Sequence, residues 1–202
     1  MPDHVETEVK LSVPDLGAVS QRLQSECAVM VSPRTLERNV RYENEARSLS
    51  ASGIVVRLRQ DSRNRLTYKG PALNTGSGIT SRFEAEVEVG DFETMSEILK
   101  KLGYHPYMIY EKYRTTYALD DTEIVLDELP YGNFVEIEGE TDPIEQAIAR
   151  LDLAGAIRYR ASYTLLFDYV RHHLKLDFTD LTFANFAGMI IPESAFQSPE
   201  PF

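Results

Sequence analysis

The sequence predicts an α+β fold, in which a closed eight-stranded antiparallel β-barrel (a tunnel) has helices packed outside. Two observations favour it. Charged side chains fill alternate positions in nearly every predicted strand, and the strands are segregated by sign, three being acidic and two basic. Since successive side chains of a strand point to opposite faces, each such strand has one charged face. A closed barrel can enclose these faces in a polar lumen and leaves no exposed edge strand.

The first predicted strand, residues 5–11, has the clearest alternation. One face carries only Glu6, Glu8 and Lys10, whereas the other leans apolar. Three charged side chains in a row are either a solvated surface or the wall of a polar interior. The remaining strands decide between the two.

A helix is expected next, because Pro14 and Asp15 are typical of helix starts and apolar residues then recur at helical spacing. The apolar stripe consists of Leu16, Val19, Leu23, Cys27 and Met30. The single cysteine lies on this stripe, which predicts a buried, inert thiol. One cysteine excludes an internal disulfide.

Three more strands are predicted before residue 70. The first, 35–43, has a weaker pattern and is followed by a loop or short turn over 44–53. The other two, 54–60 and 65–69, are joined by a hairpin turn at 61–64. Their basic faces carry Arg57 and Arg59 on one strand, and Arg65, Thr67 and Lys69 on the other.

The segment from Gly70 to Thr80 is rich in Gly, Ser, Asn and Pro, which predicts a flexible loop. Residues 82–89 then form the second strongly alternating strand. Its charged face carries Arg82, Glu84, Glu86 and Glu88. Asp91 can cap the helix that follows, and Gly103 ends it.

Three further strands complete the set of eight. Their predicted bounds are 107–119, 123–127 and 133–139, separated by turns at 120–121 and 129–132. Their charged residues are Lys112 and Arg114 on the first strand, Asp127 on the second, and Glu136 and Glu138 on the third. Each half of the chain thus has an acidic strand, a helix and then basic strands, a weak internal repeat.

Two helices and a tail are predicted at the C-terminal end. Asp142 and Pro143 would be the cap and first residue of one helix, and Ser162 would cap the other. The inward residues of the second helix would be Leu165, Leu166, Tyr169, Val170 and Leu174. We assign residues 1–176 to the tunnel domain and 177–202 to a tail, frayed at its end, that packs on the domain or on a partner subunit.

The composition excludes several classes of function. The chain of 202 residues is 43% hydrophobic, enough for a core, and its net charge of -11 argues against a general nucleic-acid-binding surface. Its first residues lack the features of a signal peptide, and no apolar run is long enough to span a bilayer. We therefore expect a cytoplasmic protein without nucleic-acid or membrane partners. The apolar tail would suit a homodimer.

Alternating charge on a single strand is most often a solvated face. Taken together, the strands indicate that the charged face points inward. Residues of the opposite face, such as Thr7, Ala85 and Thr115, suit an outer surface partly covered by helices. Carboxylates crowded into one lumen repel each other unless a cation lies between them, and Mg²⁺ or Mn²⁺ are the natural counterions. Crowded Lys and Arg side chains need an anion of similar charge. A metal-bound triphosphate meets both demands.

An ordered set of charged motifs runs through the chain, beginning with Glu6-x-Glu8-x-Lys10. The others are Arg57-x-Arg59, Lys69 before Gly-Pro, Arg82-x-Glu84-x-Glu86, Lys112-x-Arg114, Asp127, and Gly132-x-Phe134-x-Glu136-x-Glu138. The set resembles the CYTH superfamily, the triphosphate tunnel metalloenzymes, over roughly residues 3–175. One departure is Arg41-Tyr42-Glu43, where many members have two aromatic residues and an aspartate.

The resemblance implies a tunnel of eight antiparallel strands and a role for each matching residue. The metal ligands would be Glu6, Glu8, Glu84, Glu86, Asp127, Glu136 and Glu138. The substrate-binding residues would be Lys10, Arg57, Arg59, Lys69, Arg82, Lys112 and Arg114. Catalysis would rest on Glu6, Glu8 and Lys10. The helix that begins near Ser162-Tyr163 would close one end of the tunnel.

Two reactions fit the same charged lumen. The resembling family includes class IV adenylyl cyclases and several triphosphatases. We favour hydrolysis of inorganic triphosphate, ATP or thiamine triphosphate, because the lumen suits a triphosphate and no adenine-binding residue can be identified. The alternative is a class IV adenylate cyclase, which makes cyclic AMP and pyrophosphate from ATP. A third interpretation is a non-catalytic module that binds polyphosphate or nucleotide.

Overall fold

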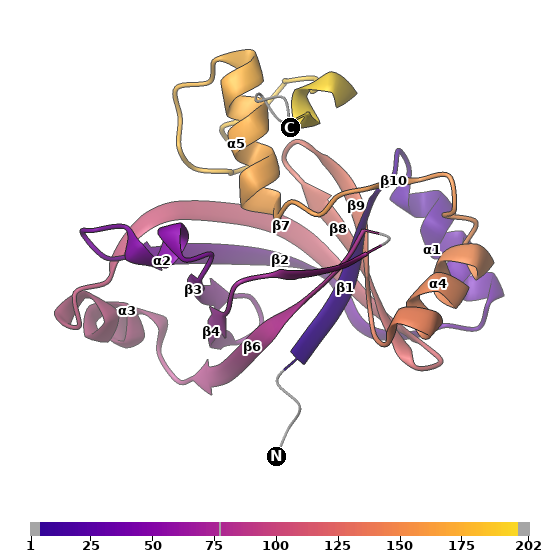
Figure 1. Cartoon of the computed structure of the whole chain (residues 1–202), viewed down its shortest axis with the longest axis horizontal. Coiled ribbons are helices and arrows are strands. Elements are labelled where there is room, and N and C mark those ends of the chain that lie inside the picture. The colour runs from indigo at the N-terminus through magenta and orange to yellow at the C-terminus, as the bar shows by residue number, and fades with distance from the viewer. Residues whose placement is uncertain (1–4, 77, 198–202) are drawn as a thin grey trace.

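The predicted closed barrel is confirmed in the structure, a computed structural model that describes residues 5–76 and 78–197. Eight antiparallel strands form a ring that is not evenly spaced round its axis, and five α-helices lie outside it (Figure 1). The ring strands are β1 (Val5–Ser12), β2 (Val29–Glu43), β3 (Val55–Gln60), β4 (Asn64–Lys69), β6 (Ile79–Val89), β7 (His105–Leu119), β8 (Thr122–Leu129) and β9 (Gly132–Glu138). The helices are α1 (Leu16–Ser25), α2 (Ser48–Ala51), α3 (Phe92–Lys101), α4 (Thr141–Arg150) and α5 (Tyr163–Leu174).

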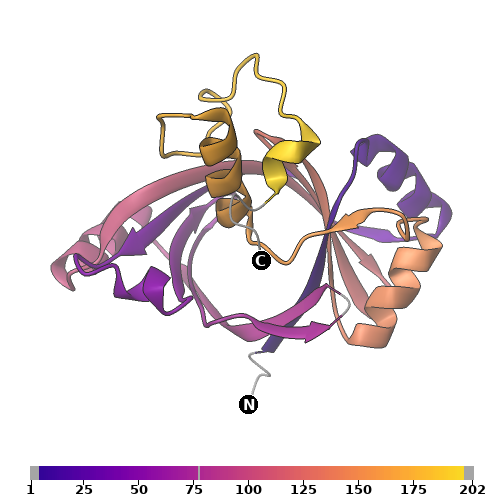
Figure 2. The same cartoon turned by 45° about the horizontal axis from the view of Figure 1, so that its top comes forward.

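The ring closes between strands that are far apart in the sequence. Its order is β1-β9-β8-β7-β2-β3-β4-β6, and β6 pairs again with β1 (Figure 2). At this closure Glu6 lies opposite Arg82. Two short strands, β5 (Leu73–Gly76) and β10 (Ile157–Arg158), extend the sheet beside β6 and β1.

Both faces of β1 are buried from Glu8 to Leu11, which distinguishes a polar lumen from a solvated surface. Val9 and Leu11 are fully buried in the outer core, and Glu8 and Lys10 on the other face are only 7% and 5% exposed. The charged face therefore points into the ring. The alternation in the sequence reflects two buried environments, one apolar and one charged.

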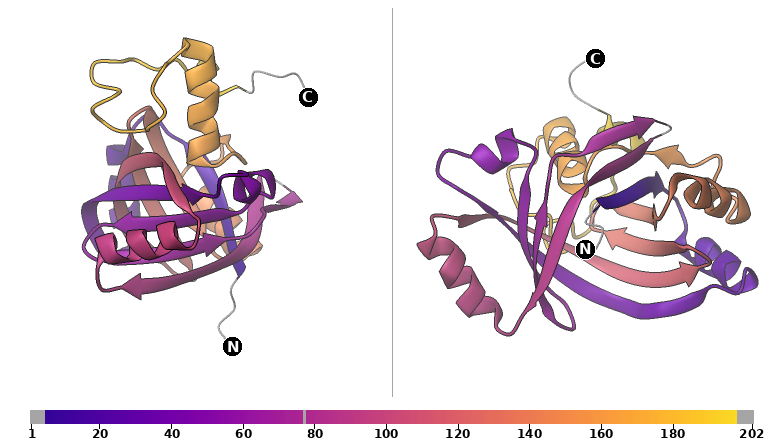
Figure 3. Two further views of the ribbon diagram at one scale, coloured as in Figure 1. Left: turned by 90° about the vertical axis from the view of Figure 1, so that its left-hand side faces the viewer. Right: turned by 60° about the horizontal axis from the view of Figure 1, so that its bottom comes forward.

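The helices lie round the ring of strands (Figure 3). Three apolar cores join α1, α3, α4 and α5 to the sheet. The first includes Leu23 of α1 and Ile144 and Ile148 of α4. The second contains Phe134 of β9 with Leu166, Phe167 and Val170 of α5. The third contains Leu58 of β3 and Tyr42 of β2 with Phe92 and Leu99 of α3. The first and third cores thus cover the outer face of the sheet. The second borders the lumen, because Phe134 lies opposite Asp127 and two positions from Glu136 on the same strand.

The chain after α5 returns to the barrel. The backbone N–H of Leu181 donates to the Ile109 carbonyl of β7 (2.9 Å), and the Leu181 carbonyl accepts from the N–H of Glu111 (2.8 Å). Phe186 and Phe196 join the core under α5. The described part of the tail therefore packs on the domain. The expected frayed end, residues 198–202, lies outside the described residues, and the division at residue 176 and the homodimer stay predictions.

The prediction of a buried Cys27 is wrong. Helix α1 ends at Ser25, and Cys27 is exposed in a left-handed conformation with φ 60°. The N–H of Ala28 bonds to the Leu23 carbonyl at 2.9 Å, which closes the helix before the stripe is complete. Met30, the last predicted stripe residue, is 52% exposed and lies in β2. Pairing with β7 extends β2 back to Val29 and overrides the helical pattern.

Three smaller predictions also need correction. The flexible loop after Gly70 contains β5, which pairs with β6; Ser77 lies outside the described residues. Helix α4 begins at Thr141 with Glu140 as its cap residue, two residues earlier than the predicted Asp142 cap. In α5, Leu165 is 41% exposed, because the inward stripe instead includes Tyr163 and Phe167.

Among the described helices, none has the length and apolar character needed to cross a membrane.

Candidate functional site

A cavity of about 760 Å³ lies inside the ring and brings the predicted residues together. All of the predicted site residues line it except Asp127. They reach it from six of the eight ring strands: β1, β3, β4, β6, β7 and β9. Residues spread over more than a hundred positions of sequence therefore share one polar interior.

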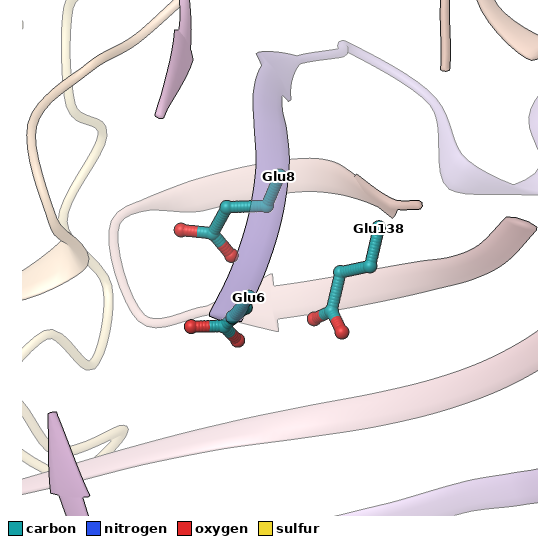
Figure 4. Close-up of side chains that lie close together, drawn as sticks. All are labelled: Glu6, Glu8 and Glu138. Carbon is teal, nitrogen blue, oxygen red and sulfur yellow. The ribbon is translucent and has the colours of Figure 1, made fainter. Parts of the chain in front are cut away.

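Three carboxylates form a compact cluster on one wall of this cavity (Figure 4). Glu6 and Glu8 come from β1 and Glu138 from β9, and one oxygen of each lies within 4.8 Å of the others. The β1–β9 register places Glu8 directly opposite Glu138. Pairing thus fixes three like charges side by side.

The cluster carries negative charge that nearby cations only partly compensate. Burial, followed by the charges of Glu6 and Glu8, raises the pKa of Glu138 to about 8. Burial would also raise the pKa of Glu6, but Lys69 and Arg82 outweigh it and hold the pKa at about 2. Carboxylate oxygens are the donors that hard divalent cations prefer, so the chemistry of the three side chains fits Mg²⁺ or Mn²⁺.

The raised pKa of Glu138 predicts a pH-dependent affinity for divalent cations. Below pH 8 the Glu138 carboxyl holds a proton that an incoming cation must displace. The affinity for Mn²⁺, measured by calorimetry on the whole chain, should rise about tenfold per pH unit from pH 6 to 8 and then level off. A Glu138→Gln variant should bind weakly and lose the slope. An affinity of the wild-type chain that is flat between pH 6 and 8 would contradict this assignment.

Each of the predicted cations in the cavity is paired with a carboxylate. The nitrogen–oxygen distances are 2.9 Å for Lys10–Glu136, 3.6 Å for Arg57–Glu86, 3.1 Å for Arg59–Glu37, 2.8 Å for Lys69–Glu6, 3.3 Å for Arg82–Glu6, 2.9 Å for Lys112–Asp127 and 2.6 Å for Arg114–Asp127. The lumen is therefore close to electrostatic balance without a ligand. A bound polyphosphate would have to bring positive charge with it or replace carboxylates as the partner of these cations.

Asp127 holds cations in place from behind the cavity wall. Its carboxylate is fully buried and accepts hydrogen bonds from Lys112 (2.9 Å), from Arg114 (2.8 and 2.6 Å) and from the Tyr163 hydroxyl (2.9 Å). Glu136 similarly joins Lys10 and Arg114. These contacts use the carboxylates of Asp127 and Glu136 to orient basic side chains.

The structure does not bring the other predicted metal ligands into the three-carboxylate cluster. Glu84 pairs with Lys69, and Glu86 accepts from Arg65 (3.1 Å) and from the Thr67 hydroxyl (2.8 Å). Neither belongs to the group that includes Glu6 and Glu8, nor do Asp127 and Glu136. The predicted set of seven ligands thus separates into three clustered carboxylates, of which Glu6 and Glu8 also pair with cations, and four that lie outside the cluster.

Three buried residues of the lumen were missed. Glu37 is 3% exposed, and its oxygens lie 3.1 Å from Arg59 and 3.6 Å from Lys112. Asn39, its neighbour on the same face of β2, accepts from Arg59 at 3.3 Å. The Tyr110 hydroxyl accepts from Arg57 at 3.0 Å. Alternation along β2 and β7 could have found them, because each lies an even number of positions from a lumen residue on its own strand.

The first residues of α5 face the lumen. Ser162, Tyr163 and Thr164 line the cavity, and the Tyr163 ring lies 4.5 Å from the Lys10 ammonium. Arg41 of β2 donates to the Thr164 hydroxyl at 2.6 Å. The N-terminus of α5 therefore borders the same space as the charged strands.

Comparisons with known proteins agree with the fold. A family model described as the CYTH domain matches residues 4–159. A candidate adenylate cyclase of Methanocaldococcus jannaschii is 27% identical over 144 residues, which cover 70% of this chain and 81% of that protein. The structure of a candidate adenylate cyclase from Vibrio parahaemolyticus has a TM-score of 0.68 at 20% identity, covering 79% of this chain and 95% of the other.

A second solved structure is similar to a comparable degree. It is a candidate adenylyl cyclase from Hippeastrum, for which a dominant triphosphatase activity is described. Its TM-score is 0.61 at 18% identity, and the match covers 81% of this chain and 95% of that one. At such identities the two solved structures show a shared fold alone.

Proposed function

The chain belongs to the CYTH domain family, and from this premise we propose that it is a divalent-metal-dependent enzyme that hydrolyses a phosphoanhydride bond of an inorganic or organic triphosphate. The observation that carries the proposal is the joint presence, in one cavity, of three clustered carboxylates and a ring of lysines and arginines. The first set suits a hard cation and the second a chain of phosphates. Neither set alone would require a metal-bound polyphosphate.

The proposed roles follow from where each side chain lies. Glu6, Glu8 and Glu138 would hold Mg²⁺ or Mn²⁺, which would supply positive charge to the phosphoryl oxygens when bound. Lys10, Arg59 and Arg114 would bind and orient the phosphates, each already fixed by a carboxylate partner. Because these cations are buried and preorganised, they would stabilise charge that develops on the transferred phosphoryl group without reorganising.

The lining of the cavity favours hydrolysis over cyclisation. Among the cavity-lining residues that the structure describes, the aromatic ones are Tyr110 and Tyr163, and both are 7% exposed. The Tyr110 hydroxyl is bonded to Arg57, and the Tyr163 ring lies beside Lys10. Because so little of either residue is exposed, little aromatic surface is available for an adenine to stack on. The relatives described as candidate adenylate cyclases nevertheless make cyclisation of ATP the second candidate.

Product analysis separates the candidate functions. The purified chain with Mg²⁺ or Mn²⁺ should release phosphate from inorganic triphosphate, and anion-exchange chromatography of an ATP reaction should show no cyclic AMP. Chelation should stop the release. Formation of cyclic AMP and pyrophosphate would instead establish the cyclase. Tight binding of both compounds with no turnover would establish the non-catalytic module.

A further inference from the structure

Arg41 differs from the other cations of the cavity. It projects from β2 into the lumen and lies directly opposite Arg57 of β3 in the strand register. Of the lysines and arginines that line the cavity in the described part of the chain, Arg41 alone forms no ion pair with a carboxylate. It also lies in the segment where the sequence departs from the motif of the resembling family.

The groups that the Arg41 side chain contacts directly are a hydroxyl and an aromatic ring. One terminal nitrogen donates to the Thr164 hydroxyl, the guanidinium lies 5.3 Å from the centre of the Tyr107 ring, and Nε is shielded from solvent without a hydrogen-bond partner. Two acids lie in its neighbourhood. Glu43 accepts from the backbone N–H groups of Leu49 and Ser50 in α2, and Asp168 pairs with Arg171 at 3.5 Å. Glu43 is therefore engaged elsewhere, and Asp168 interacts electrostatically with both Arg171 and Arg41 but forms its ion pair with Arg171.

Arg57, opposite Arg41 in the strand register, is a second cation whose hydrogen-bond donors are not all used. Arg57 is 6% exposed, and its Nε, like that of Arg41, is shielded and has no hydrogen-bond partner. Its terminal nitrogens donate to the hydroxyls of Tyr110 (3.0 Å) and Thr67 (3.1 Å), and Glu86 lies 3.6 Å away. Like charges directly opposite each other on paired strands are destabilising. An anion held between the two guanidinium groups would relieve that repulsion and satisfy both Nε atoms.

The charge of the cavity lining differs between the side next to α5 and the opposite side. On β8, Asp127 contacts Tyr163 at the start of α5, whereas Glu123 lies four residues earlier in the strand. Glu123 faces Glu138 across the β8–β9 pairing, and both line the cavity. Carboxylates therefore collect on the side away from α5, and the unpaired cation lies beside α5. A ligand with one anionic end would be aligned by this difference.

We propose that Arg41 and Arg57 form a subsite for a terminal phosphoryl group, which directs an unesterified phosphate end of the substrate toward α5. The remainder of the substrate then extends toward the carboxylate cluster of Glu6, Glu8 and Glu138. The inference rests on the proposed function in placing a polyphosphate in this cavity. It goes beyond that function in defining the substrate class: compounds with at least one free phosphoryl terminus, as opposed to phosphate chains esterified at both ends.

Three ligands test the subsite by binding, without any need for turnover. Imidotriphosphate has two free phosphoryl ends, the β,γ-imido analogue of ATP has one, and diadenosine triphosphate has none. Their dissociation constants would be measured by calorimetry with Mg²⁺ on the wild-type chain, Arg41→Gln and Arg38→Gln. Arg38 is the matched control, because it lies on the same strand but faces outward over Phe92, with 5.9 Å between its guanidinium and the ring centre.

Arg41→Gln should weaken binding of the first two ligands by about 10- to 100-fold, the loss expected for a charge-assisted hydrogen bond at a shielded site. It should change the affinity for diadenosine triphosphate less than threefold, and Arg38→Gln should leave all three affinities unchanged. Equal losses for all three ligands, unchanged affinities in Arg41→Gln, or no binding by the wild-type chain would overturn the subsite. Selective binding without hydrolysis of inorganic triphosphate would sustain the subsite and overturn the proposed function instead.

Discussion

A Glu8→Gln variant should release phosphate from inorganic triphosphate roughly a thousand times more slowly than the wild-type chain, a loss of about 4 kcal/mol of transition-state stabilisation. Glu8 is the buried member of the three-carboxylate cluster, and its oxygen lies 3.7 Å from the Lys10 ammonium. An amide of the same shape cannot neutralise a divalent cation. The measurement is kcat/KM at saturating Mg²⁺, with calorimetry of Mn²⁺ binding as an independent readout.

Glu88→Gln is the matched control for this loss. Glu88 belongs to the acidic face of β6, but its side chain is 63% exposed, pairs with Arg63 at 3.5 Å and does not line the cavity. Its replacement should change kcat/KM less than twofold. If Glu8→Gln kept most of the activity, or if both variants lost it equally, the carboxylate cluster would not be the metal site.

Asp127→Asn should destabilise the fold by about 3 kcal/mol, because it removes one of the two carboxylate partners of Lys112 and of Arg114 and leaves Glu37 and Glu136 as the others. The Asp127 carboxylate is fully buried and receives hydrogen bonds from Lys112, Arg114 and Tyr163. Asparagine has nearly the same volume, so the loss would come from charge and not from a cavity. Urea unfolding followed by circular dichroism would measure the change in the free energy of unfolding.

Glu128→Gln, one residue further along β8, provides the comparison. Glu128 faces outward and pairs with the half-exposed Arg34 at 2.7 Å. A surface pair of this kind contributes at most about 1 kcal/mol. Similar losses in Asp127→Asn and Glu128→Gln would contradict the role of Asp127 as the buried anchor of the basic side chains.

Alternating charge in the sequence identified lumen residues on those strands that carry charge on only one face. β1 and β6 are of this kind, and the charged residues with which they line the cavity were all identified. β2 is different, because Arg34 and Arg38 put charge on its outer face as well. The pattern along it is therefore weak, and Glu37 and Asn39 were missed although both are buried in the lumen.

The grouping of the carboxylates could not be predicted from the sequence, since it depends on strand register. Glu138 meets Glu8 because β9 pairs with β1 at that position. Asp127 lies opposite Arg114 of β7 and forms ion pairs with Arg114 and Lys112. Both carboxylates follow the same alternating pattern in the sequence. Only the order and register of the closed ring separate a candidate metal ligand from a structural partner.

A crystal structure with Mn²⁺ and imidotriphosphate would test the central claim most directly, because anomalous scattering locates the metal independently of the phosphates. We predict an anomalous peak within coordination distance of Glu6, Glu8 and Glu138, with phosphate oxygens on Lys10 and Arg114. A manganese peak away from these carboxylates, or phosphates bound outside the ring, would contradict the assignment of this tunnel as a metal-dependent triphosphate site.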